Sequence, residues 1–558
     1  MRKIMLVLIA VIAIVSIGWA CTTIIVTKGA SVDGSVMTSH SADCAHCDFR
    51  YVYVPPADYE PGSMMAVYPF REPYPRHVGK DRGPTYDDPN FTPDEPLGFI
   101  PQVEHTFGYF DAVFGVINEH QLAIGECTCS AKVYAQAVAG ECIFDVAALS
   151  RVAMERCTTA REAVELMGAL AVEYGYYGWG ETLTIADTEE AWVFEICATP
   201  DKKSALWAAK KVPDGHVFVE SNMFRIRDLY PNDPDIMFSP NLIQVATEAG
   251  WYNPDECPPD QPIDWMATVS TGEYSFPYYS LRRTWRVLDR VAPSQGFSPW
   301  VEDSFTRAYP FSVVPDEKLS VADVIDLFRD HYEGTEFDLT QGLAAGPFGN
   351  PNRYSGSSKL IKGSWERAIS IFRCEYVFVS QSRSWLPDPV GGVVWWGPAA
   401  PQEAVLVPMY CGITDVPYAY DTGSLRAFDR DVAAWAFNFM GNWAELKWSY
   451  MYPEIQALQK KIEGKLFAVQ PAIEAAAAIL YDIDPALCKE FLTDYVADVT
   501  DRVMAEVWDF NEYLITKYRD GYINIPNVGQ SVGYPDWWLK EVGYADGHIF
   551  GPDGYKQK

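Results

Sequence analysis

Hydrophobic and polar positions form short strand-like and helical blocks through most of the chain. Strand patterns lie between residues 103 and 130 and again from 181 to 220, with helical patterns at about 142–173 between them. More strand patterns follow, including 376–380 and 391–396. Because the strands come in blocks instead of alternating singly with helices, the pattern favours packed sheets between helical layers over a parallel βαβ sheet.

The pattern changes near residue 426. From 426 to about 520 it predicts long amphipathic helices, for example 455–467 and 494–517. We expect these helices to complete the outer layer of the core or to form the surface of a homo-oligomer. The chain then divides into a catalytic core of residues 21–425, a helical region of 426–520 and a tail of 521–558, to which we assign no function.

The first twenty residues have the organisation of a secretory signal peptide. Two basic residues precede the apolar run 4–17, and Gly18 and Ala20 place small residues at the third and first positions before Cys21. We therefore predict cleavage of the Ala20–Cys21 bond and a secreted or periplasmic protein. Two alternatives are an uncleaved anchor and a lipoprotein with lipid on Cys21. No later stretch approaches the roughly 20 continuous apolar residues of a membrane span, so we expect no stable membrane insertion after processing.

Composition and charge limit the class of partner. The 558 residues include 44 basic and 75 acidic side chains, a formal net charge of −31. Such a polyanion repels phosphate backbones, which argues against nucleic-acid binding. The hydrophobic content of 48% is sufficient for a large core. Residues 55–101 are rich in proline and aromatic residues without a clear period, which predicts a long ordered loop.

Cleavage before Cys21 would give one residue both a thiol and a free α-amino group. An amine with a pKa of about 7.7–8 can accept the proton of a thiol with a pKa of about 8.5, and the thiolate is the nucleophile. Residues 21–38 read as a strand, a turn and a second strand, which predicts a β-hairpin. In that hairpin Cys21 lies opposite residues 41–47. His40 and Asp43 should therefore lie near the amine, and Asp43 is our candidate for orienting it.

Ordered motifs continue from this hairpin along the chain. They are Cys-Thr-Thr-Ile-Ile-Val at 21–26, Asp-Gly-Ser at 33–35, Ile-Pro-Gln-Val at 100–103, Ala-Ile-Gly-Glu at 123–126, Asn-Met-Phe-Arg at 222–225 and Ser-Arg-Ser-Trp-Leu-Pro at 382–387. In order and spacing the set resembles the dipeptidase and secernin family of N-terminal-nucleophile (Ntn) cysteine peptidases over roughly residues 21–450. The resemblance implies an α+β fold, the αββα four-layer sandwich of Ntn hydrolases, and dipeptide substrates.

One position departs from the family pattern. The family usually has an arginine where this chain has His40. An arginine is charged at any working pH, whereas a histidine is charged only when protonated. We keep His40 as a substrate-binding candidate, while the pH optimum and substrate preference implied by the family are open.

Attack on a carbonyl group creates an oxyanion that needs fixed donors. Asn222, after the strand-like run 216–220, is the candidate donor, although asparagine at a strand end is also an ordinary turn residue. Arg225 and Arg227 lie on one side of an extended continuation and could bind a substrate carboxylate, or else pair with structural acids. The resemblance makes Glu126 a pocket residue that could bind a substrate ammonium, with a structural role as the alternative.

The Cys44-Ala45-His46-Cys47 segment allows three interpretations. A single CxxC lacks the second pair that a four-ligand zinc site needs, although neighbouring side chains could supplement it. Outside the cytoplasm a local disulfide is favoured over free thiols or a metal. We predict no metal and no other cofactor for the reaction.

The leading hypothesis is an exported cysteine hydrolase that cleaves dipeptides through a thioester acyl-enzyme. One alternative keeps the nucleophile but acts on linear amides with an apolar acyl group, as penicillin and bile-salt acylases do. Another is a lipid-anchored binding protein in which Cys21 serves only for attachment.

Overall fold

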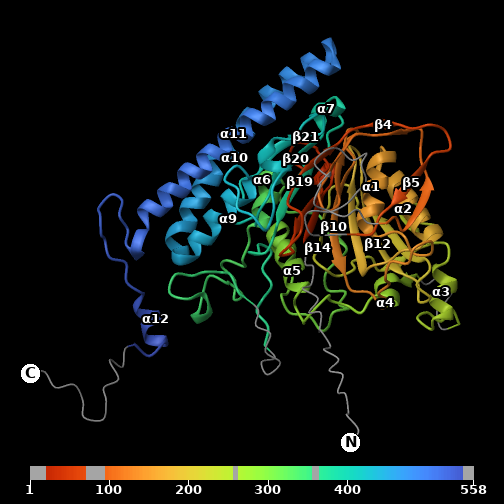
Figure 1. Ribbon diagram of the computed structural model, residues 1–558. Coiled ribbons are helices and arrows are strands. Elements are labelled where there is room, and N and C mark those ends of the chain that lie inside the picture. Colours follow the sequence, from red (N-terminus) through yellow and green to blue (C-terminus); the bar gives the residue numbers. More distant parts are fainter. Residues whose placement is uncertain (1–20, 71–94, 256–261, 355–362, 545–558) are drawn as a thin grey trace, which may run out of the picture.

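The computed structural model describes residues 21–70, 95–255, 262–354 and 363–544 (Figure 1). Outside these residues lie the predicted signal peptide, the middle of the predicted loop 55–101 and the last part of the tail.

The larger of two packed sheets contains eight antiparallel strands. Their order is β16 (Ile236–Phe238), β13 (Ala205–Lys211), β12 (Ala191–Ala198), β11 (Gly180–Ala186), β10 (Ala123–Cys129), β9 (Gly115–Asn118), β8 (Tyr109–Asp111) and β3 (Val52–Val54). Every residue of β10, β11 and β12 is buried, so both faces of the sheet centre are covered. The helices α1 (Val146–Arg156) and α2 (Ala160–Tyr174) pack on one face of this sheet. Thr159 and Glu162 form a capping box that starts α2.

The second sheet layer carries the start of the described chain. β2 (Ser39–Ala42) pairs with β19 (Tyr376–Gln381). β19 also pairs with β20 (Val393–Gly397), and β20 pairs with β21 (Val407–Tyr410). β1 (Thr23–Val26) pairs with β14 (Val217–Glu220), and β14 with β18 (Ser312–Val313). Antiparallel bridges from Thr22 to Ser41 and from Val26 to Met37 join the two groups. The hairpin predicted for residues 21–38 is thereby confirmed.

The two sheet layers meet closely where β2 crosses β10. A Cβ atom on Gly125 would lie 2.2 Å from the carbonyl oxygen of Ser39 and 2.9 Å from Thr23 Oγ1. Only glycine therefore allows this approach. Helices cover the outer face of the second layer: α5 (Leu281–Val291) on β14, α6 (Val321–Phe328) on β19, and the long C-terminal helices on β21. The αββα, α+β prediction is confirmed.

The C-terminal region is a long helical hairpin (Figure 1). α9 (Ala433–Ala444) leads into α10 (Trp448–Ile483), and α11 (Pro485–Lys517) packs against both. The predicted helices 455–467 and 494–517 lie inside α10 and α11. The boundary at residue 425 and the proposed oligomer surface stay predictions.

One helical run of the C-terminal region is long and apolar. By length and composition the run Ala433–Ile483 could cross a membrane, and 17% of its most apolar window is buried. Polar side chains such as Gln470 and Glu474 interrupt its apolar residues, so a search for an unbroken apolar stretch does not find it. The absence of stable membrane insertion stays a prediction.

Short elements complete the described fold. They are β4 (Ala57–Asp58), β5 (Met64–Val67), β6 (Gly98–Pro101), β7 (His105–Thr106), β15 (Asp228–Leu229), β17 (Ile263–Asp264), α3 (Leu242–Glu248), α4 (Trp265–Val269), α7 (Asp388–Gly391), α8 (Tyr418–Asp421), α12 (Asp536–Glu541) and 3-10 turns at Lys28–Ala30, Pro293–Gln295, Leu343–Ala345, Glu445–Lys447 and Arg519–Gly521. β5 pairs with β6, and β4 with β7. The described parts of the segment predicted as a loop are therefore partly paired strands.

Candidate active site

Cys21 lies two residues before the start of β1 and is 3% exposed. Thr22 and Ser41 form an antiparallel bridge, and the same register places Cys21 opposite Ala42, next to Asp43. The main-chain N–H of Asp43 donates a hydrogen bond to the Cys21 sulfur. Burial raises the pKa of the Cys21 thiol well above its ordinary value, and the nearby Glu126 and Cys127 raise it further. At neutral pH the resting sulfur is therefore a thiol that needs a base.

Asp43 is itself fully buried beside this thiol. Its carboxylate accepts hydrogen bonds from Arg367 and from Ser41 Oγ, the latter at 3.2 Å. Its carbonyl oxygen accepts a hydrogen bond from Arg373. Among the described residues Asp43 Oδ1 has no hydrogen-bond partner. The predicted residue is thus at the site, held by two arginines that the sequence analysis did not identify.

Arg283 of α5 organises the main chain around the nucleophile. Its guanidinium donates to the carbonyl oxygen of Cys21 at 2.7 Å and to Thr22 Oγ1 at 2.9 Å. A further N–H group donates to Asn222 Oδ1 at 2.7 Å. Arg283 is fully buried, so this fork is rigid.

Asn222 follows β14 and reaches the same place. It has a φ of 66°, a left-handed conformation that asparagine tolerates better than most residues. Its backbone N–H donates to Cys127 Sγ at 3.1 Å, and the Cys127 thiol donates to the Cys21 carbonyl oxygen at 3.2 Å. Its side-chain amide donates to the carbonyl oxygen of Thr128 at 2.6 Å. The structure therefore places the predicted oxyanion donor beside the nucleophile, with one of its N–H groups already in use.

His40 is neutral in this environment. Burial lowers its pKa to about 3. Its Nδ1 accepts the backbone N–H of Glu126 at 2.9 Å, so the hydrogen of the neutral ring is on Nε2. His40 lies at the site as predicted, yet it cannot supply the positive charge that an arginine would bring. One donor atom each from Cys21, His40 and Glu126 lie within 4.8 Å of one another, a set that suits zinc, so the metal-free reaction stays a prediction.

Glu126 and Glu181 bring two carboxyl groups to the site. The Glu126 carboxyl group, on β10, is hydrogen-bonded to the Cys21 thiol, and its Oε1 accepts a hydrogen bond from Thr128 Oγ1 at 3.1 Å. The Glu181 side chain, on the neighbouring strand β11, is hydrogen-bonded to the Glu126 carboxyl group. Burial raises the pKa of both groups. The sequence analysis identified Glu126 but not Glu181.

Arg225 and Arg227 are occupied elsewhere. Arg225 donates to the carbonyl oxygen of Pro310 at 2.6 Å. Arg227 forms a two-point ion pair with Asp264, at 2.8 and 2.6 Å, and donates to the carbonyl oxygen of Phe305. The structure supports the structural alternative for both, which corrects the expectation that they are free to hold a substrate carboxylate.

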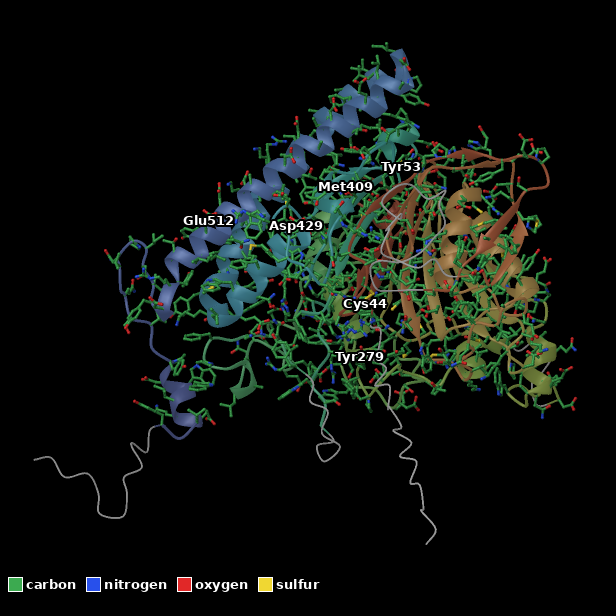
Figure 2. All side chains as sticks on the ribbon, in the orientation of Figure 1. Cys44, Tyr53, Tyr279, Met409, Asp429 and Glu512 are labelled. Carbon is green, nitrogen blue, oxygen red and sulfur yellow. A yellow bond between two sulfur atoms is a disulfide. The ribbon has the colours of Figure 1, made fainter. Side chains whose placement is uncertain are left out.

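The CxxC segment forms a Cys44–Cys47 disulfide in the buried turn after β2. This agrees with the favoured interpretation and leaves neither sulfur as a thiolate ligand for a metal. Cys21 and Cys127 are both free thiols. In Figure 2, Cys44 lies close to Tyr279, and Arg373 links the two segments because it bonds both Asp43 and Tyr279 Oη.

A cavity of about 240 Å³ opens beside Tyr279. It is lined by Phe276, Pro277, Ser364, Trp365 and Glu366. The rings of Phe276 and Tyr279 are 5.2 Å apart, and Tyr279 also stacks near the Arg283 guanidinium. Tyr279 therefore lies between one lining residue of the cavity, Phe276, and Arg283.

The sequence model of peptidase family C69 matches residues 20–461, most of the chain. The chain belongs to this family. C69 is a family of cysteine peptidases, so the protein is a cysteine peptidase, and the resemblance stated from the motifs is confirmed.

Curated relatives share about a quarter of their residues with this C69 peptidase. A "Probable dipeptidase" of Latilactobacillus sakei is 27% identical over 411 residues, covering 72% of this chain and 76% of the relative. A "Probable dipeptidase" of Salmonella dublin is 24% identical, covering 73% and 84%. A "Probable dipeptidase A" of Streptococcus pyogenes serotype M3 is 22% identical, covering 88% and 96%. Among solved structures, penicillin V acylase from Agrobacterium tumefaciens aligns over 70% of this chain and 86% of its own, with 11% identity and a TM-score of 0.29.

Sequence analysis missed the residues that reach the site from distant segments. These are Cys127, Glu181, Arg283, Arg367 and Arg373. No sequence signal separates Arg283 from the other arginines of the same helical pattern, Arg282, Arg286 and Arg290.

Proposed function

We propose that this C69 peptidase is an exported dipeptidase whose nucleophile is the N-terminal residue Cys21, released by removal of residues 1–20. The observation that carries this is the position of Cys21. It lies two residues before the first strand of the sandwich, its sulfur accepts a hydrogen bond from the Asp43 main chain and its carbonyl oxygen accepts one from Arg283. The signal-peptide pattern and a family match that starts at residue 20 support the cleavage point.

The freed amine is the base that the buried thiol needs. As the sulfur attacks the peptide carbonyl, the amine accepts the thiol proton and a carbon–sulfur bond forms. Arg283 and Asn222 keep the nucleophile and its surroundings fixed while the oxyanion develops. The protonated amine then gives its proton to the leaving amine, and water hydrolyses the thioester, restoring the thiol.

Restricted access supports short substrates. The nucleophile is almost completely buried. A folded protein cannot approach such a sulfur, which agrees with a small substrate. The curated relatives are named as dipeptidases, which agrees with this limit.

The decisive experiment combines the mass of the exported protein with the Cys21→Ser variant. We expect a mature chain that starts at an unmodified Cys21, and a fall of about 10³-fold or more in kcat/KM in the variant. Cys157→Ser is the matched control, because Cys157 is equally buried at the end of α1 and should leave activity intact. Full activity in Cys21→Ser, another N-terminus or a lipid on Cys21 would each contradict the proposal.

A substrate panel then defines the specificity. Dipeptides should be cleaved much faster than tripeptides or N-acyl amides, and activity should survive dialysis against EDTA. Preference for apolar N-acyl amides would instead indicate the acylase alternative, and loss of activity with EDTA would indicate a required metal.

A further inference from the structure

His40 has an N–H group without an acceptor in the described part of the chain. Its Nδ1 accepts the main-chain N–H of Glu126 at 2.9 Å, and a main-chain N–H group can only donate. The ring hydrogen is therefore on Nε2. Among the described residues Nε2 has no hydrogen-bond partner, although His40 is only 1% exposed. Almost all buried N–H groups in folded proteins have an acceptor, so this one indicates an acceptor that arrives with the substrate.

The Glu126 carboxyl group does not fill this role. His40 Nε2 is 3.9 Å from Glu126 Oε2, which is too far for a hydrogen bond. The Glu126 carboxyl group is already hydrogen-bonded to Glu181, to Thr128 and to the Cys21 thiol. A metal ion does not suit this tautomer either, because the ring has no lone pair left once Nδ1 accepts a hydrogen bond and Nε2 carries the hydrogen.

Aromatic rings hold the imidazole in one orientation. Its ring centre is 5.4 Å from that of Tyr376 and 6.0 Å from that of Phe378, and both rings of β19 are stacked on it. Phe114 lies 5.7 Å away. Turning the ring to exchange its two nitrogens would break these contacts and the bond to Glu126. The Nε2 donor is therefore fixed before the substrate binds, as an effective transition-state donor must be.

The Cys21 sulfur is close to this donor but is not bonded to it. A ring nitrogen of His40 lies within 4.8 Å of the sulfur, and Nε2 forms no hydrogen bond with it. When the sulfur attacks a carbonyl group, the oxygen becomes an anion one carbon atom away from the sulfur. A donor that serves this oxyanion lies about 2.7–3.1 Å from the oxygen, which is a place near the sulfur but beyond direct contact with it.

We propose that His40 is a catalytic residue whose Nε2–H group donates a hydrogen bond to the oxyanion, alongside Asn222. This inference rests on the proposed peptidase reaction. As the sulfur–carbon bond forms, the carbonyl π electrons move to the oxygen and the thiol proton goes to the Cys21 amine. His40 keeps its proton throughout. Its hydrogen bond is strongest when the oxygen carries the full charge, so it should raise kcat more than it improves substrate binding.

Two substitutions of similar size separate the donor from the rest of the ring. In His40→Gln the side-chain amide can donate from a position close to that of Nε2, whereas His40→Met has no donor. With L-alanyl-L-alanine as substrate, His40→Met should lower kcat about 10²-fold with KM nearly unchanged, and His40→Gln should stay within about tenfold of the wild type.

The matched control is His331→Met. His331 is also 1% exposed and packs against an aromatic ring, that of Trp448, but its Nε2 is bonded to Gln402 away from the nucleophile. Per folded molecule, kcat and KM of this variant should stay within about a factor of two of the wild type.

Alkylation of Cys21 by iodoacetamide is the second readout, because it consumes the thiolate and forms no oxyanion. Followed by the mass of the N-terminal peptide, its rate should stay within about twofold of the wild type in both His40 variants. A fall in alkylation that matches the fall in kcat would overturn the inference, since it would show that His40 acts on the thiolate, on the amine or on packing. Equal losses of kcat in the Gln and Met variants, or no loss in the Met variant, would also overturn it.

A further variant serves if His40→Met does not fold. In His40→Asn the side-chain oxygen can accept the Glu126 N–H, while the shorter side chain has no donor at the position of Nε2. The same loss of kcat is expected, with alkylation intact. Failure of the proposed peptidase function has a different signature: the wild-type enzyme would not cleave L-alanyl-L-alanine, or Cys21→Ser would cleave it as fast as the wild type.

Discussion

The sandwich around Cys21 and the α10–α11 hairpin bury different kinds of side chain. Near Cys21 the buried positions include carboxyl groups, arginines and a neutral histidine. In α10 and α11 most buried positions are apolar, such as Ile455 and Leu492, and the tip exposes Ile479 and Ile483. Apolar burial stabilises a fold, whereas burial of charge costs stability unless it is compensated. The catalytic region therefore depends on its surroundings for stability, and its polar groups serve chemistry.

A buried ion pair connects the two regions and gives the largest expected change in stability. Arg329, at the end of α6, donates to both carboxylate oxygens of Glu463 on α10, at 2.6 and 3.0 Å, and Leu406 N–H adds a third bond. Glu463→Ala should lower the free energy of unfolding by about 3–5 kcal/mol because it leaves a buried guanidinium uncompensated. Urea unfolding measures this effect, and kcat/KM per folded molecule should stay unchanged.

The control for this variant is Lys461→Ala. Lys461, also on α10, pairs with Glu506 of α11 on an exposed surface, and such a surface pair contributes less than about 1 kcal/mol. A Glu463→Ala protein as stable as the Lys461→Ala protein would contradict the role of Arg329–Glu463 as the connection between the regions.

Arg283→Lys probes the catalytic region directly. Lysine keeps the charge but loses the fork that binds the Cys21 carbonyl, Thr22 and Asn222 together, so kcat/KM should fall about 10²-fold. Arg286→Lys, one turn along α5 and paired with Asp330, should leave kcat/KM within a factor of two. Similar losses in both variants would mean that α5 acts only through its packing.

The pH dependence of stability tests the cost of a buried acid. Burial raises the pKa of Glu220 to about 7 from about 4.5. Because its folded pKa is the higher one, Glu220 contributes stability that is fully present below pH 4.5 and is lost as the pH rises through about 7. Relative to the wild type, Glu220→Gln should gain about 1.4 kcal/mol of unfolding free energy per pH unit from pH 4.5 to 7 and stay level above that. Parallel stability curves for the two proteins between pH 4.5 and 8 would show that Glu220 ionises normally.

The smallest effect is expected at the tip of the helical hairpin. Ile479→Ser and Ile483→Ser alter side chains that are 63% and 68% exposed, so the free energy of unfolding should change by less than about 0.5 kcal/mol. Leu492→Ala, fully buried on α11, should cost about 2–5 kcal/mol in the same measurement. A large loss at Ile479 or Ile483 would show that the tip is covered in solution.

The local sequence pattern was sufficient to predict part of the catalytic site. The strand–turn–strand pattern placed Cys21 opposite residues 41–47, a range that includes Asp43, because the connection between two paired strands limits their register. The Cys44–Cys47 disulfide closes over three residues and was accessible to the same reasoning. The amphipathic period located α10 and α11 but not their ends, since an added turn of helix needs only a neighbouring surface to pack on.

By itself the sequence determined the secondary structure of the core, the family and the nucleophile candidate, all of which depend on residues close together or on an ordered set of short motifs. Only the tertiary structure decided that Arg283 and Glu181 reach Cys21, that Arg225 and Arg227 do not serve as predicted, and that His40 is uncharged. The physical reason is that side-chain partners and protonation states depend on what folding buries together. Arg283 is 262 positions from Cys21, and no local period records that approach.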